Sequence, residues 1–292
     1  MHLKIALLGG DGIGPEVLAQ AVKTLRSVGD VFGHTFTFKK ALVGAKAIAS
    51  TGDPLPEETI KICQKSDAIL FGAIGSLEYD NNPDALVRPE QGLLRLRKEL
   101  GLFANIRPIK VFHHLIPGSP LKENIIKGSD FVIFRELTSG IYFSEKKLSD
   151  DGSHASDLCE YSEKEIGRIT HLAFKAAKKR KKKLTLVDKA NVLETSRLWR
   201  RVVMAIGKSY PEVQLDCLYI DKATTQMVLN PSQFDVILTD NLFGDILNDQ
   251  ASVLLGSTGI LPSASIGTDI AMFEPVHGSY PQATGKKIAN PV

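Results

Sequence analysis

The sequence has no long hydrophobic run and little cysteine. No uninterrupted apolar stretch approaches the ~18 to 20 residues that a membrane-spanning helix needs, and the amino-terminal MHLKIALLGG lacks the basic, apolar and small-residue order of a signal peptide. The three cysteines, Cys63, Cys159 and Cys217, are widely spaced and form no CxxC pair. This spacing excludes a disulfide framework and a thiolate metal site. We therefore expect a cytoplasmic protein with reduced thiols.

The sequence also has little excess charge of either sign. Lysine and arginine number 36 against 33 aspartates and glutamates, a formal net charge of +3, which is too small to make nucleic acid the main partner. The local exception is the run KKRKKK from Lys178 to Lys183. It ends an amphipathic helical pattern, so we interpret it as a solvated helix end, where cations are favourable. RNA binding by this run is the weaker alternative, because no aromatic residues interleave with it.

What the sequence does contain is an alternation of strand and helix patterns over 292 residues, 43% of them hydrophobic. Strand-like runs cover residues 3–9, 36–42, 67–75, 104–112, 130–137, 183–189, 214–221 and 234–240, and amphipathic helical patterns cover 15–29, 56–66, 161–179 and 195–210. The alternation predicts an α/β fold whose helices cover a largely parallel sheet. Residues 144–161 are polar, contain DDG and break the alternation, which predicts a protruding hairpin.

The glycine cluster GGDGIGPE runs from Gly9 to Glu16 between the first strand and the first helix. Its glycines stand at positions 9, 10, 12 and 14, so they do not form GxGxxG, and no lysine follows as in a phosphate-binding loop. A tight turn and a ligand contact both remain open for this segment.

Arginines stand near the ends of several apolar runs. Arg95 and Arg97 lie in GLLRLRKELG, Arg107 in FANIRP and Arg135 in IFRELTSGIYF. The planar guanidinium pairs bidentately with carboxylates, so arginines that converge on one site suit a di- or tricarboxylate substrate. Exposed surface charge is the alternative for each of them.

Acidic residues provide a candidate metal site. Asp245 and Asp249 are four residues apart in a helical pattern, so both carboxylates project from one face. A divalent cation such as Mg²⁺ relieves their repulsion, and Asp221 can complete the oxygen set. The alternative is that these aspartates are ordinary exposed charges that bind no metal. Lys189, just past a buried strand, is a candidate base, and Tyr142 is a candidate proton donor.

Six motifs together resemble a known family. GGDGIGPEV, GLLRLRKELGLFANIRP, FRELTSGIYF, VDKANVLE, DNLFGDILND and GSTGILPSASIG through FEPVHGS are similar to motifs of the metal-dependent β-decarboxylating dehydrogenases of 2-hydroxy acids, the isocitrate/isopropylmalate dehydrogenase family. The resemblance implies two interleaved α/β domains around a large mixed sheet, with the active-site cleft between them. It assigns residues 1–102 and 256–292 to the first domain, on the cofactor side, and 103–255 to the second. It also implies a homodimer with shared sites and an arm near 144–161, with no membrane or nucleic-acid partner.

The resemblance also implies a reaction and a set of site residues. The reaction is the NAD-dependent oxidative decarboxylation of 3-isopropylmalate to 4-methyl-2-oxopentanoate and CO₂ in leucine biosynthesis. Its catalytic residues would be Tyr142, Lys189 and Asp221, and its Mg²⁺ or Mn²⁺ ligands Asp245 and Asp249 with Asp221 from the partner subunit. Substrate would contact Arg97, Arg107, Arg135, Asp221, Glu90, Leu93, Leu94 and Val192. NAD would contact Ile13, Glu274, His277, Gly278, Ser279, Gln282 and Asn290.

Three features bear on specificity and activity. Leu93 and Leu94 offer an apolar wall for an isopropyl group, where a charged substituent would lose its hydration unpaired. NAD-using members commonly carry an aspartate where this chain has Gln282, which hydrogen-bonds ribose but does not repel a 2′-phosphate. Family members also continue for several dozen residues past the IANP motif, so this chain is expected to lack a carboxyl-terminal segment. A related substrate (homoisocitrate, isocitrate or tartrate) and an inactive dimerising remnant are the alternatives.

Overall fold

The structure, a computed structural model, describes residues 1–82 and 85–290 as two compact units. The first unit comprises Met1–Leu102 and Pro262–Val292, and the second comprises Phe103–Leu261. The chain thus returns to the first unit at residue 262 rather than at the predicted 256. The reason is that Gly256 packs within the second unit, where a Cβ at this position would lie 2.5 Å from the carbonyl oxygen of Gly118.

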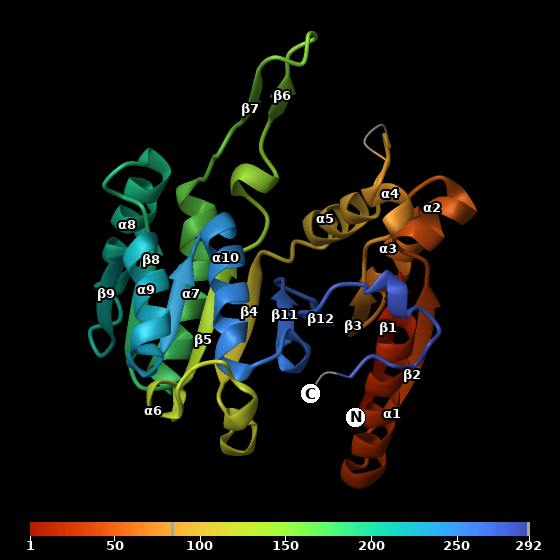
Figure 1. Ribbon diagram of the computed structural model, residues 1–292, viewed down its shortest axis with the longest axis horizontal. Coiled ribbons are helices and arrows are strands. Elements are labelled where there is room, and N and C mark those ends of the chain that lie inside the picture. The colour runs from red at the N-terminus through yellow and green to blue at the C-terminus, as the bar shows by residue number, and fades with distance from the viewer. Residues whose placement is uncertain (83–84, 291–292) are drawn as a thin grey trace. The chain divides into compact units, whose positions relative to one another are not determined.

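The first unit is a five-stranded sheet with helices on both faces (Figure 1). Its strands are β1 (His2–Gly10), β2 (Thr35–Ala41), β3 (Ala68–Ala73), β11 (Pro262–Ile266) and β12 (Ala271–Pro275). Its helices are α1 (Gly14–Phe32), α2 (Ala45–Thr51), α3 (Glu57–Gln64), α4 (Leu77–Asp80) and α5 (Pro89–Glu99). The strand order is β2-β1-β3-β12-β11, parallel except for β11 against β12.

Alternation along β1 divides the apolar side chains of the first unit between two faces of its sheet. Ala6 and Leu8 join the larger core, to which α3 and α5 contribute Ile60, Cys63 and Leu96. Ile5 and Leu7 point the other way and pack with side chains of α1 in a smaller cluster. One long helix therefore covers a face that carries less buried apolar surface than the opposite one.

The second unit is also a five-stranded sheet. Its strands are β4 (Ala104–Lys110), β5 (Asp130–Glu136), β8 (Lys183–Asp188), β9 (Gln214–Tyr219) and β10 (Val236–Thr239), and β6 (Lys146–Leu148) and β7 (Ala155–Asp157) form a separate pair. Its helices are α6 (Glu123–Ile126), α7 (Glu163–Lys179), α8 (Glu194–Gly207), α9 (Ile220–Leu229) and α10 (Asn241–Ser252). The strand order is β4-β5-β10-β8-β9, with only β4 antiparallel to its neighbour.

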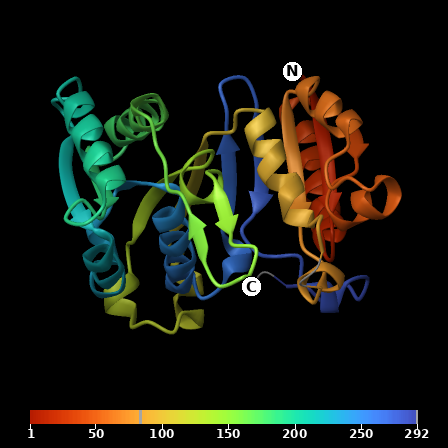
Figure 2. The same cartoon turned by 90° about the horizontal axis from the view of Figure 1, so that it is seen from above.

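Helices cover both faces of this sheet. Figure 2 shows α7 and α8 side by side on one face, with α9 and α10 on the other. Helix α7 begins with a capping box, in which Ser162 Oγ accepts from Glu165 N and the Glu165 carboxylate accepts from Ser162 N. Strand β5 is buried along almost its whole length, as its continuous apolar run predicts for an interior strand.

The α/β prediction is confirmed, with differences in detail. Residues 144–161 contain the antiparallel pair β6–β7, which extends away from the helices of its unit in Figure 1. The elements that the sequence patterns missed include α2, α4, α6, α9, β11 and β12. The prediction of a solvated helix end at the lysine run was wrong in part, because α7 ends at Lys179 and the next residue, Arg180, forms ion pairs with Asp130 and Asp235. No helix in residues 1–82 and 85–290 has both the length and the apolar character needed to cross a membrane.

Candidate functional site

Two predicted site arginines share one face of the second unit's sheet. In the antiparallel pair β4–β5, Asn105 lies opposite Arg135. Because strand side chains alternate, Arg107 lies on the same face as Asn105 and Arg135. Both guanidinium groups are buried, with Arg107 at 9% and Arg135 at 4% exposure. The fold therefore brings these two cations together in a place where they need anionic partners.

Helix α10 supplies those partners through the two predicted metal ligands. Asp245 Oδ1 accepts from Arg135 Nη1, and Asp249 Oδ1 lies 3.8 Å from Arg107 Nη1. The helix can approach this closely because residue 244 is glycine, where a Cβ would lie only 2.5 Å from Arg135 Cγ. Two carboxylates one helical turn apart thus face two arginines on neighbouring strands.

Tyr142 joins this cluster from a short turn of 3₁₀ helix (Gly140–Tyr142). Its hydroxyl donates to Asp245 Oδ2 at 2.9 Å, and its ring faces the guanidinium of Arg135 at 5.7 Å. Burial and the Asp245 carboxylate raise the pKa of Tyr142 to about 12, against the opposing effect of Arg135. The phenol therefore stays protonated at neutral pH, as a proton donor must.

A buried carboxyl lies at the start of α10. Asp240 is 8% exposed, and its Oδ1 accepts from the backbone N–H of Phe243 at 2.8 Å, which caps the helix. Burial raises the pKa of Asp240 to about 7. Burial also raises the pKa of Glu136, whose carboxylate accepts from the backbone N–H groups of Thr138 and Ser139. Neither group was predicted from the sequence, and Glu136 forms its ion pair with Arg168 of α7, on the sheet face opposite α10.

Lys189 and Asp221 form a second charged pair in this unit. Lys189 follows β8, and Asp221 is the second residue of α9, not the end of a strand as the sequence pattern predicted. Lys189 Nζ donates to Asp221 Oδ1, and this bond lowers the pKa of Asp221. Among the described residues, no three His, Cys, Asp or Glu side chains are grouped to hold a metal ion. One chain thus contributes Asp245 and Asp249 as a pair, and Asp221 is not part of it.

Two asparagines that sequence reasoning missed orient the arginines. Asn241 Oδ1 accepts from Arg135 Nε at 2.9 Å, while its amide donates to the carbonyl oxygen of Ser139 at 3.0 Å. Asn105 Oδ1 accepts from Arg107 Nε at 3.0 Å. The sequence did contain a signal for Asn105: it stands two residues before Arg107 in a strand pattern, which places both side chains on one face of the sheet.

In the first unit, Arg97 pairs with Glu274 instead of standing free for a ligand. Arg97 Nη2 donates to Glu274 Oε1 at 3.2 Å, and the two side chains are only 12% and 8% exposed. The resemblance had assigned Arg97 to substrate and Glu274 to cofactor. Their direct contact was not predicted, because it joins residues 177 positions apart in the sequence.

Helix α5 carries the predicted specificity residues. Leu93 packs against the buried core of the first unit, whereas Leu94 is half-buried and does not belong to that cluster. Glu90 is exposed at the start of the helix, and its Oε1 would lie 3.5 Å from a Cβ at Gly75. Helix packing therefore accounts for Leu93, and Leu94 retains free apolar surface.

The glycine cluster forms a tight turn that the chain itself fills. A Cβ at Gly12 would lie 1.9 Å from the carbonyl oxygen of Ser279, which also accepts from the N–H of Ile13 at 2.8 Å. Asp11, whose role the sequence did not indicate, accepts from the backbone N–H groups of Ala45 at 3.0 Å and Gly75 at 3.2 Å. The turn thus joins three segments of the unit, and its glycines are needed for close backbone approach.

Of the other predicted cofactor contacts, Ser279 meets this turn through its backbone. Ile13 and Ser279 are buried at 4% and 6% exposure, so each offers little side-chain surface. His277 Nδ1 is 2.9 Å from the carbonyl oxygen of Gly278. Gln282 and Asn290 are exposed, and so is Val192, which follows Lys189 in the second unit.

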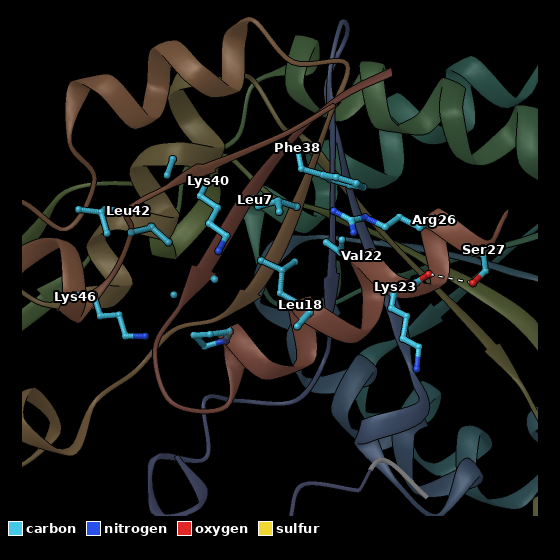
Figure 3. Close-up of a pocket in the computed structure, with 16 residues that line it drawn as sticks. Leu7, Leu18, Val22, Lys23, Arg26, Ser27, Phe38, Lys40, Leu42 and Lys46 are labelled. Atoms are coloured by element: carbon cyan, nitrogen blue, oxygen red, sulfur yellow. Dashed lines mark hydrogen bonds between the residues drawn. The ribbon is translucent and has the colours of Figure 1, made fainter. Parts of the chain in front are cut away.

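A pocket of about 830 Å³ lies elsewhere in the first unit, between α1, β1 and β2 (Figure 3). Leu7, Leu18, Val22 and Phe38 form its apolar floor, and it contains none of the predicted catalytic or metal-binding residues. It lies on the sheet face that packs against α1. The pocket is therefore not part of the candidate site.

Comparison with known proteins gives a consistent answer. The family model described as "Isocitrate/isopropylmalate dehydrogenase" matches residues 4–292. The protein belongs to this family. A 3-isopropylmalate dehydrogenase of Aquifex aeolicus is 54% identical over 99% of the chain and 80% of its own length, and one of Sulfurimonas denitrificans is 53% identical over 99% and 81%.

Solved structures agree with the isocitrate/isopropylmalate dehydrogenase assignment. The isocitrate dehydrogenase of Methylococcus capsulatus matches with a TM-score of 0.87 at 34% identity, over all of this chain and 82% of that one. A β-decarboxylating dehydrogenase of Thermococcus kodakarensis matches with a TM-score of 0.77 at 37% identity, over 99% and 79%. The chain thus spans about four fifths of these relatives, and the resemblance based on six motifs is confirmed at the level of the family.

Proposed function

We propose that this dehydrogenase oxidises and decarboxylates 3-isopropylmalate with NAD to give 4-methyl-2-oxopentanoate and CO₂, a step of leucine biosynthesis. Relatives that carry the name 3-isopropylmalate dehydrogenase support this reaction. The observation that carries the proposal is the cluster in which buried Arg107 and Arg135 face Asp245 and Asp249 beside Tyr142. The reaction needs cations for a diacid, oxygen donors for a metal ion and a proton donor. This cluster offers all three.

The arginines would bind the two carboxylates of the substrate. Arg107 and Arg135 are fixed by Asn105 and Asn241 through their Nε atoms, which leaves the Nη side of each fork directed at anions. Arg97 of the first unit would supply a third cation. Buried guanidinium groups held in one orientation bind a carboxylate with less loss of side-chain entropy than flexible surface lysines do.

Asp245 and Asp249 fit a divalent cation by their chemistry. Both are hard oxygen donors on one helix face, and their side chains are 39% and 75% exposed, so an ion from solvent can reach them. In a homodimer with shared sites, the partner subunit's Asp221 would be the third ligand. When bound, Mg²⁺ or Mn²⁺ would polarise the oxygen on substrate C2 and stabilise the negative charge that develops as CO₂ departs.

The remaining residues would move protons. When bound, NAD would supply the acceptor for the hydride of C2. Lys189 and Asp221, acting from the partner subunit, would take the hydroxyl proton as the C2 carbonyl forms. The bond between C3 and its carboxylate would then break, and its electron pair would form the C2–C3 double bond of an enolate. Tyr142 would donate its phenolic proton to C3, which returns the 2-keto acid.

Substrate and cofactor preference follow from a few side chains. We assign the isopropyl group to the half-buried Leu94, with Leu93 behind it and Val192 of the partner subunit as a further apolar contact. NAD is the proposed cofactor, although Gln282 provides no negative charge against the 2′-phosphate of NADP. Ile13, Glu274, His277, Gly278, Ser279 and Asn290 are the other proposed NAD contacts.

The decisive experiment measures reduction of NAD by 3-isopropylmalate with Mg²⁺, compared with isocitrate, homoisocitrate, malate and tartrate and with NADP in place of NAD. We expect the highest kcat/KM for isopropylmalate with NAD. A preference for a tricarboxylate would contradict the assignment of Leu94. If no substrate is turned over, and neither substrate nor Mn²⁺ raises the melting temperature, the chain is an inactive remnant.

A further inference from the structure

The ion pair of Arg97 and Glu274 joins α5 to β12 inside the first unit. Glu274 Oε1 accepts from Arg97 Nη2 and from Ser265 Oγ, each at 3.2 Å. Because the two charged side chains are only 12% and 8% exposed, solvent screens their attraction weakly. If either charge lost its partner, the other would remain buried and uncompensated.

The pair satisfies only part of the Arg97 guanidinium. Arg97 Nε is buried and has no hydrogen-bond partner among the described residues. Arg95, two residues earlier on α5, is held differently, since its Nη1 and Nη2 bind both carboxylate oxygens of Asp53 at 3.1 and 3.0 Å. A ligand carboxylate that reached Nε and Nη2 of Arg97 together would satisfy the guanidinium better than Glu274 does.

We propose that Glu274 is a positioning residue that holds Arg97 in the free enzyme and releases it when the cofactor binds, so that cofactor and substrate bind cooperatively. The inference rests on the proposed function, in which Arg97 binds a substrate carboxylate and Glu274 contacts the cofactor. Cofactor hydroxyl groups that donate to Glu274 compete with Arg97 for the same carboxylate. Arg97 then pairs with a substrate carboxylate, and the substrate no longer has to displace the Glu274 carboxylate from it. By linkage, substrate strengthens cofactor binding by the same factor.

Calorimetric titration tests this coupling in the intact chain. The dissociation constant of 3-isopropylmalate is measured with Mg²⁺, without and with saturating NADH, which cannot accept a hydride and therefore gives a ternary complex that does not react. For the unmodified protein we expect NADH to strengthen isopropylmalate binding by about 5- to 150-fold, the usual range of coupling between sites. The reverse titration, NADH with and without isopropylmalate, should give the same factor.

Two variants separate the coupling from general loosening of α5. Glu274→Gln keeps the side-chain shape and removes the charge, so isopropylmalate alone should bind more tightly and the coupling factor should fall towards one. Asp53→Asn weakens the other ion pair of the same helix, that of Arg95, and should keep the original factor. If Glu274→Gln unfolds, Glu274→Asp retains the charge on a shorter side chain and should give a smaller factor than the unmodified protein.

Three results would overturn the inference. The first is a coupling factor of one in the unmodified protein although both ligands bind. The second is an unchanged coupling factor in Glu274→Gln. The third is a coupling factor that falls as far in Asp53→Asn as in Glu274→Gln. Failure of the unmodified protein to bind either ligand contradicts the proposed function itself, and the coupling with it. Because this last result differs from binding without coupling, the two failures can be told apart.

Discussion

Tyr142 donates its hydroxyl hydrogen to Asp245, so the proposed proton donor and a proposed metal ligand are joined at 2.9 Å. Arg135 contacts the other oxygen of the same carboxylate. One carboxylate therefore orients a phenol and neutralises a guanidinium, and its charge is one of the causes that keep the phenol protonated. A substitution at any of the three residues should affect the other two.

Removal of the Tyr142 hydroxyl should affect catalysis more than substrate binding. In Tyr142→Phe we expect kcat to fall about 10²- to 10⁴-fold, the usual range for a lost general acid, with little change in KM. Tyr210→Phe is the matched control, because that ring stacks on Phe174 in a different part of the unit. Since the pKa of Tyr142 is raised to about 12, deprotonation of this residue should produce no loss of activity below about pH 11. A variant with normal turnover would remove Tyr142 from the mechanism.

Asp240 predicts a pH dependence of stability. Its pKa is raised from 3.8 to about 7 by burial, so between these values the folded state holds a proton that the unfolded state has released. Stability should therefore decrease as pH rises through this window and stay low above it. Asp240→Asn keeps an oxygen that caps α10 and removes the buried charge. We expect the variant to be more stable than the unmodified protein at pH 8, by about 1–3 kcal/mol, and nearly equal at pH 4.

Chemical unfolding between pH 4 and 8 measures this difference. Other buried acids such as Glu136, whose pKa is also raised, contribute to both proteins, so the informative quantity is the variant minus the unmodified protein. A difference that is constant across the pH range would show that Asp240 does not titrate with folding.

The sequence predicted the members of the charged cluster, but not their partners. The i, i+4 spacing of Asp245 and Asp249 and the placement of Arg107 and Arg135 in strand patterns depend on local periodicity, which the residues themselves display. The bond from Arg135 to Asn241 depends on how α10 crosses β5, which is decided by packing between segments 106 positions apart. No local pattern encodes such a contact.

The same distinction explains the missed elements and the lysine run. Strand β11 reads PSASI, in which the two buried positions are serines and the alternating Pro262 is exposed, so the sequence shows no buried apolar face and pairing with β12 defines the strand. In the lysine run, composition predicted solvent exposure throughout. Arg180 instead forms an ion pair with Asp235, a carboxylate that is 1% exposed and lies 55 positions away in the sequence.

The ion pairs of Arg180 should contribute to stability. Its Nε donates to Asp235 Oδ1 at 2.8 Å, and its Nη2 donates to Asp130 Oδ1 at 2.6 Å. Arg180→Ala would leave the buried Asp235 without its counter-charge, so we expect the free energy of unfolding to fall by about 3 kcal/mol, the lower end for a broken buried pair because Arg180 is partly exposed. Lys179→Ala, at an exposed helix end, should change it by less than about 0.5 kcal/mol. Equal effects of the two substitutions in urea denaturation would restore the interpretation of a solvated run.

Leu93 and Leu94 are adjacent on α5, yet they should respond differently to substitution. Leu93 packs against the core of the first unit, whereas Leu94 is half-buried outside that cluster. Leu94→Ser should lower kcat/KM for 3-isopropylmalate about 10-fold relative to malate, because a small apolar contact contributes ~1–3 kcal/mol to discrimination, while the melting temperature changes little. Leu93→Ser should lower the melting temperature, because a polar group replaces a packed one. The two measurements are kcat/KM ratios and thermal unfolding of both variants. If Leu94→Ser leaves the ratio of isopropylmalate to malate unchanged, Leu94 does not contact the isopropyl group, and the selection must come from apolar residues of another segment.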